Sequence, residues 1–191
     1  PELKFANSTE AKTDNGLLFK WKYYENNDHG SVPLITEYDA LYFLFPWYTF
    51  KEIEQVFDPN ISVDELLGLI DSHYKNVSDH FGYESLPSEG LINSLGYALM
   101  NNPYKAYTLL NLNIQNYPKS SNVYDSMGDY YLGQKDSIKA LEYFQNSFAI
   151  LEELGDKQGI SNVMIRICRL HGRILNLQRR VLSSSFRLLE P

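Results

Sequence analysis

The sequence predicts a mainly α-helical protein, in which an array of helical hairpins follows a short segment of one strand and one helix. Three observations lead to this fold class. Apolar residues recur every three or four positions from residue 62 onward, which is the period of an amphipathic helix. Two stretches within this region share one pattern of large and small residues, which indicates an internal repeat. Ahead of them, residues 17–24 form an aromatic run that is typical of a strand.

The first part of the chain is expected to form a strand, a loop and a helix. The strand covers residues 17–24, and the helix runs from about Pro33 to Phe45. A break that contains a proline follows at residues 58–60. We therefore place the first domain at residues 1–57.

Three short motifs in this domain resemble an esterase family. They are Trp21-Lys22-Tyr23-Tyr24, Asp28-His29-Gly30-Ser31-Val32-Pro33-Leu34 and Glu37-Tyr38-Asp39-Ala40-Leu41. Together they are similar to the last strand, the histidine loop and the last helix of the α/β-hydrolase esterases related to esterase D and to the siderophore esterases. The resemblance implies that His29 is the catalytic histidine, which takes the proton of the serine nucleophile. Asp28 and Ser31 are interpreted as residues that shape the loop.

His29 has no matching nucleophile in this sequence. The G-x-S-x-G turn that carries the serine of such hydrolases does not occur, and their histidine comes last in the chain order of the triad. We therefore expect the chain to be the C-terminal remnant of a longer esterase, inactive by itself, with the upstream hydrolase domain as its partner. A strand at residues 17–24 would then lack its sheet neighbours, so we expect it to form a homodimer with a second copy or to fold back on the helices.

The second domain, residues 62–158, is predicted to be helical throughout. Ser62 followed by Glu65 forms a capping box, and a helix with one apolar face extends from it to Gly82. His73 and His80 share a face of this helix, but a metal site would need ligands one turn apart and a carboxylate. We interpret both as solvated or core-edge histidines and predict no metal and no cofactor.

An internal repeat occupies the middle of this domain. Residues 90–100 pair with residues 122–132, and in both a pair of small residues ends in a glycine. The matched second halves place Ala106 opposite Ala140 and Leu110 opposite Phe144, with Pro118 closing the first unit. This pattern resembles the tetratricopeptide repeat, in which small residues let paired helices approach closely. A third, degenerate copy is expected from Ile160, with Cys168 at the position of the glycine.

The resemblance to tetratricopeptide repeats implies a concave groove lined by the first helix of each pair. The residues expected to face it are Asn93, Tyr97, Met100, Asn122, Asp125, Asp129 and Leu132. A peptide or a protein is the expected occupant, and the residue pattern favours no more specific ligand class. The alternative is that the repeats only buttress the hydrolase domain. Arrays of this kind need about three units for stability, and the sequence offers two and a half, so the array would be stabilised by its neighbour.

The last segment, residues 159–191, differs in charge from the rest of the chain. It contains all six arginines against one acidic residue, a net charge of +5, whereas residues 1–158 carry 11 lysines against 23 acidic residues, a net charge of −12. Two interpretations stay open for this basic helical tail. It is either a non-native extension, produced by a frameshift or a vector, or a basic amphipathic capping helix.

The amino-acid composition disfavours several classes of partner and of structure. The chain has 191 residues, of which 43% are hydrophobic, and a net charge of −7, which disfavours nucleic acid and anionic membranes as main partners. A single cysteine excludes an internal disulfide framework. The first functional hypothesis is therefore the C-terminal part of a serine esterase, and the second is a non-catalytic, tetratricopeptide-like protein-interaction module.

Overall fold

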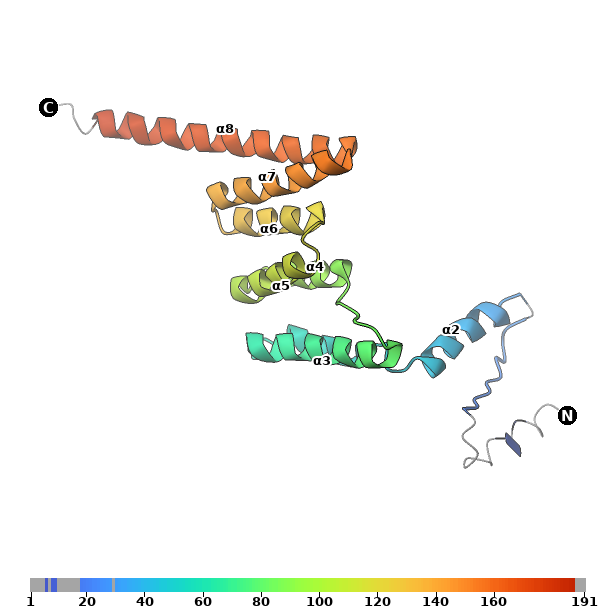
Figure 1. Cartoon of the computed structure of the whole chain (residues 1–191). Helices are drawn as coiled ribbons and strands as arrows, with labels where there is room; N and C mark the ends of the chain where they lie inside the picture. Colours follow the sequence, from blue (N-terminus) through green and yellow to red (C-terminus); the bar gives the residue numbers. More distant parts are fainter. Residues whose placement is uncertain (1–5, 7, 10–17, 29, 188–191) are drawn as a thin grey trace. The chain divides into compact units, whose positions relative to one another are not determined.

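The computed structural model describes residues 6, 8–9, 18–28 and 30–187, with residues 177–187 described through their backbone (Figure 1). The chain divides into two compact units, Pro1–Lys51 and Glu52–Pro191. Within the described residues the secondary structure is helical, so the prediction of a mainly α-helical protein is confirmed. No helix of this described part combines the length and the apolar character that crossing a membrane requires.

The strand predicted at residues 17–24 is not formed where the structure describes it. Residues 18–24 have no regular secondary structure, and Leu17 lies outside the described residues. A strand needs the backbone groups of a neighbouring strand, and the described part of the chain contains none. Side chains hold the segment instead, because Lys22 Nζ and Tyr24 OH both donate to Oδ2 of Asp39, at 2.6 and 2.7 Å. The segment thus folds back against the helix of its own unit.

That helix, α2 (Val32–Leu44), confirms the helix predicted from Pro33 to Phe45. It begins after a loop shaped by Asp28, whose Oδ1 accepts from the backbone amides of Gly30 and Ser31 at 3.0 Å each. None of the residues of α2 is buried, although the helix is strongly apolar.

A short 3₁₀ helix, η1 (Lys51–Phe57), starts at the last residue of the first unit and continues into the second, where α3 (Val63–Phe81) follows. The predicted capping box is present, because Ser62 Oγ accepts from the amide of Glu65 while the Glu65 carboxylate accepts from the amide of Ser62. The helix ends at Gly82, whose φ of 73° lies in the left-handed region that glycine adopts without strain.

Five further helices follow, and from α5 onward each one packs against the helix before it. They are α4 (Glu89–Ala98), α5 (Pro103–Asn116), α6 (Ser121–Gly133), α7 (Ser137–Leu154) and α8 (Lys157–Arg187). Contacts join α4 to α5, α5 to α6, α6 to α7 and α7 to α8, and also α4 to α6 and α3 to α5. Short turns between successive helices make them hairpins, so α4 and α6 are each the first helix of a pair.

The close approach expected at the repeated glycines is found at both copies. A Cβ atom added to Gly96 would lie 2.8 Å from Cδ2 of Leu110, and one added to Gly128 would lie 2.5 Å from Cε1 of Phe144. Ala106 and Ala140 are fully buried beside them. The glycines therefore let the first helix of each hairpin lie directly on a large side chain of the second.

The third copy of the repeat differs from the expectation. Cys168 is exposed, whereas the two glycines to which it was aligned are buried. The buried residues of α8 in the apolar cluster shared with α7 are Val163 and Leu170, and Cys168 is not part of that cluster. Since α8 continues without a break to Arg187, it supplies one helix and not a hairpin.

Candidate functional site

A group of polar side chains connects the three helices α4, α6 and α8. Tyr97 of α4 donates its hydroxyl hydrogen to Oδ2 of Asp129 on α6, at 2.9 Å. Arg166 of α8 lies 2.6 Å from Oδ1 of Asp129 and 3.2 Å from Oδ2 of Asp125. We call these four residues the polar cluster. It brings together residues that lie up to 69 positions apart in the sequence, from Tyr97 to Arg166.

The helical spacing of the sequence explains why the cluster forms. Asp125 and Asp129 lie four positions apart on α6 and therefore project from the same face on successive turns. Arg166 reaches them across Phe144 of α7, and its guanidinium carbon lies 5.3 Å from the centre of that ring. The Phe144 ring, which fills the space beside Gly128, thus also makes a cation–π contact with the guanidinium group of Arg166.

The cluster has one more carboxylate than it has cations. Burial raises the pKa of Asp125, although the positive charge of Arg166 acts in the opposite direction. Burial lowers the pKa of the Arg166 guanidinium. Its hydrogen bond to Asp129 and the charges of the nearby carboxylates act in the opposite direction, and on balance the pKa of Arg166 is raised. Since the side chains of Asp125 and Asp129 keep 28% and 27% of their surface exposed, an incoming cation can reach both.

Tyr97 remains a neutral hydrogen-bond donor at physiological pH. Burial raises the pKa of its phenol to about 12, and the neighbouring carboxylates add to this shift. The side chain still leaves 40% of its surface exposed. It therefore offers both an aromatic surface and a fixed hydroxyl group at the edge of the cluster.

The other predicted groove residues have different environments. Asn122 donates to Oε1 of Glu89 at 2.8 Å, which makes a second link between α6 and α4. Asn93 Oδ1 is buried and, among the described residues, has no hydrogen-bond partner. Met100 and Leu132 pack against the apolar clusters of the core, so their assignment to the groove is not supported by these contacts. Contact with neighbouring helices is favourable for these apolar side chains, because it removes their surface from water.

Arg166 is the residue of the polar cluster that the sequence did not predict. The alignment that places Cys168 opposite Gly128 also places Arg166 opposite Ser126, directly after Asp125. A basic residue at that register position, facing two acidic ones, was the available signal. The change from net negative to net positive charge at residue 159 hides this signal, because it sets the last segment apart from the repeats.

The histidines contribute less to any site. His29 lies outside the described residues. His73 is partly buried, which lowers its pKa, and Nδ1 of His80 lies 2.8 Å from the carbonyl oxygen of Asn76. In the described part of the chain, no group of three or more histidine, cysteine, aspartate or glutamate side chains is placed to hold a metal ion.

Comparison with known proteins gives no family assignment for this chain. No family model, no curated protein and no solved structure matches it.

Proposed function

We propose that the chain is a non-catalytic, tetratricopeptide-like interaction module that binds an extended peptide segment of a partner protein. The binding face is formed by α4, α6 and α8, with the polar cluster at its centre. Support comes from the order of the helices, in which α4 and α6 each begin a hairpin, and from the close packing at Gly96 and Gly128. An extended peptide suits a face to which several successive helices each contribute side chains.

The excess carboxylate of the polar cluster is the observation that carries this proposal. Asp125 and Asp129 share a single arginine, so one negative charge is left without an equivalent positive charge. A lysine or arginine side chain of the peptide would neutralise it with a charge-assisted hydrogen bond. The exposed surface of Tyr97 would pack against the aliphatic part of the same side chain.

A peptide-display library tests the proposal. The wild-type chain is expected to select peptides enriched in lysine or arginine, and the double variant Asp125→Asn, Asp129→Asn is expected to lose this enrichment. Glu142→Gln, an exposed residue of α7, is the control for the change in net charge. Selection by the double variant equal to that of the wild type would place the binding site elsewhere.

Buttressing of a neighbouring domain is the competing interpretation. Under that interpretation the polar cluster only joins helices, so its substitution would lower the melting temperature without any effect on peptide selection. Measuring both quantities on the same variants therefore separates the two interpretations.

The esterase hypothesis stays a prediction. Its local support is the loop before α2, which Asp28 shapes through two backbone hydrogen bonds as expected. The chain lacks the nucleophile motif, so we expect no hydrolysis of short aryl esters above background. Hydrolysis by this chain that survives His29→Ala would show that the chemistry lies elsewhere.

A further inference from the structure

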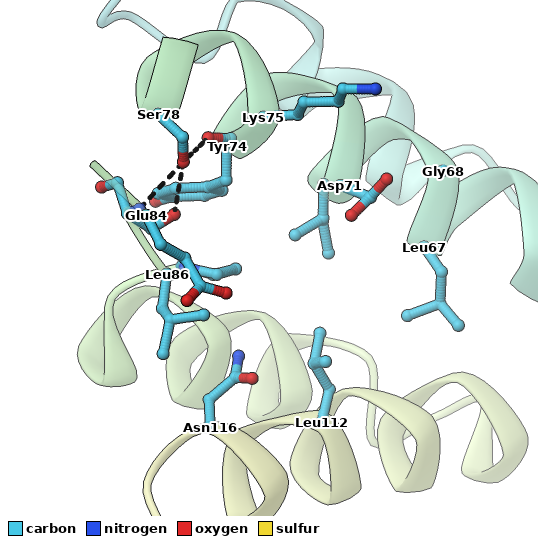
Figure 2. Close-up of a pocket in the computed structure, with 13 residues that line it drawn as sticks. Leu67, Gly68, Asp71, Tyr74, Lys75, Ser78, Glu84, Leu86, Leu112 and Asn116 are labelled. Atoms are coloured by element: carbon cyan, nitrogen blue, oxygen red, sulfur yellow. Dashed lines mark hydrogen bonds between the residues drawn. The ribbon is translucent and has the colours of Figure 1, made fainter. Parts of the chain in front are cut away.

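A cavity of about 660 Å³ lies within the second unit, between α3 and the hairpin that follows it (Figure 2). Figure 2 shows Leu67 and Asp71 of α3 on one side, and Leu112 and Asn116 of α5 on the other. The volume falls in the range of small-molecule binding sites, roughly 300 to 1,000 Å³.

The third wall of the cavity is the segment between α3 and α4, and hydrogen bonds fix it at both ends. The amide of Ser85 donates to Ser78 Oγ on α3 at 2.8 Å. The hydroxyl of Tyr117, at the end of α5, donates to the carbonyl oxygen of Pro87 at 2.8 Å. The wall is therefore tied to both helices that face the cavity.

Gly68 is a residue whose presence the helix itself does not explain. It lies inside α3, where glycine costs about 1 kcal/mol relative to alanine. Its φ is not in the left-handed region, and a Cβ atom added to it would meet nothing within 4 Å. The missing side chain keeps space open in the cavity that Gly68 lines.

Asn116 supplies an unused hydrogen-bond donor. Its Nδ2 atom is buried, and among the described residues it has no hydrogen-bond partner. A buried donor left in this state costs about 1 to 3 kcal/mol, which an acceptor on a bound molecule would recover. The other contacts that the cavity offers are mostly apolar, from Leu67, Ile70, Leu86, Pro87 and Leu112.

We propose that this cavity binds an uncharged, mainly apolar small molecule that carries one hydrogen-bond acceptor, such as a carbonyl oxygen, which accepts from Asn116. The charged residues that line the cavity are Asp71, Glu84 and Lys75, so negative charge is in excess and an anionic ligand is disfavoured. The site is separate from the proposed peptide-binding face and does not depend on it.

The experiment uses Nile red as the probe, because this dye is uncharged, carries a carbonyl group and fluoresces more strongly in apolar surroundings. The wild-type chain is expected to bind it saturably with one dye per chain. Gly68→Leu fills the cavity and should weaken binding at least about tenfold, since it removes the apolar contact of the dye. Asn116→Asp replaces the donor with an acceptor and should weaken binding by about tenfold as well.

Matched variants control for binding elsewhere on the chain. Gly172→Leu adds the same side chain at an exposed position of α8 and should leave the affinity unchanged. Leu41→Ser removes an exposed apolar residue of α2, to which the dye could adhere, and should also leave it unchanged. Circular dichroism verifies folding, and if Gly68→Leu does not fold, Asn116→Asp decides.

Three results would overturn the proposal. They are the absence of saturable binding, binding that survives the cavity variants in their folded state, and a loss of binding in Leu41→Ser equal to that in Gly68→Leu. The first means that the cavity takes no ligand of this class, and the other two mean that the dye binds at another surface.

Discussion

Gly128 and Phe144 fix the distance between α6 and α7 through a contact that leaves no room for a side chain. A Cβ atom at position 128 would lie 2.5 Å from the Phe144 ring, which is fully buried. We expect Gly128→Ala to destabilise the chain by about 1 to 3 kcal/mol, because the helices must separate or the ring must leave its rotamer. Urea denaturation measures this change in the free energy of unfolding.

The control for Gly128→Ala is Gly172→Ala. Position 172 also lies in a helix but has open space around it, so alanine should be neutral or stabilising by up to about 1 kcal/mol. Combining Gly128→Ala with Phe144→Leu should cost less than the sum of the two single changes, since the smaller side chain makes room. Equal stability of Gly128→Ala and the wild type would contradict the close packing of this hairpin.

Asp125 should make stability depend on pH. Because burial raises its pKa above the ordinary value, the folded chain binds this proton more tightly than the unfolded chain. Its contribution to the free energy of unfolding therefore falls as pH rises from about 4 through the raised pKa. Asp125→Asn removes this term, while Arg166 keeps its contact with Asp129 at 2.6 Å.

We therefore expect the stability of Asp125→Asn relative to the wild type to increase with pH over this range and then level off. Thermal unfolding followed at several pH values between 3 and 7 measures the difference. A difference that decreases as pH rises would mean that the folded chain stabilises the Asp125 carboxylate, and the account of an excess negative charge would be wrong.

The candidate site was predictable where it follows the helical register and not beyond it. Tyr97 and Asp129 lie at matching positions of two similar repeats, and Asp125 lies one helical turn before Asp129, so the pattern alone placed the three residues on one face. The ion pairs of Asp125 and Asp129 depend on Arg166, which belongs to a helix whose sequence departs from the repeat pattern. Asn116 and Gly68 could not be predicted either, because the space that they border is defined by the crossing of α3 and α5.

At the scale of elements, the helices of the second unit were predictable because each carries its own signals. The capping box at Ser62 and the glycine at position 82 mark both ends of α3 from local sequence. The strand predicted at residues 17–24 is different, since a strand is stable only with a partner strand. A composition typical of a strand was therefore not sufficient to form one. Residues 18–24 lie against α2 without regular secondary structure.

Ser62→Ala tests the start of α3. The substitution removes the acceptor of the Glu65 amide, which lies 3.2 Å from Ser62 Oγ, and should cost about 1 kcal/mol in the free energy of unfolding. Ser72→Ala, at an exposed position inside the same helix, should be neutral or slightly stabilising. Equal effects of the two substitutions would show that the cap contributes nothing.

At the scale of the whole molecule, the two units should differ in local stability. No residue of α2 is buried, whereas α5 and α6 contain fully buried Leu109, Leu110, Val123 and Met127. Local opening costs least where few apolar contacts are lost. We expect backbone amides of α2 to exchange with deuterium much faster than those of α5 and α6, as measured by mass spectrometry. Protection of α2 equal to that of α6 would mean that its apolar surface is covered in solution.

The most direct test of the proposed function locates a bound peptide on the chain. Deuterium exchange is measured for the chain alone and with a saturating lysine- or arginine-containing peptide from the display library. We expect slower exchange in α4, α6 and the part of α8 around Arg166, and no such slowing in the Asp125→Asn, Asp129→Asn variant. Slowing confined to α2, or to α3 and α5, with α4, α6 and α8 unchanged, would contradict it.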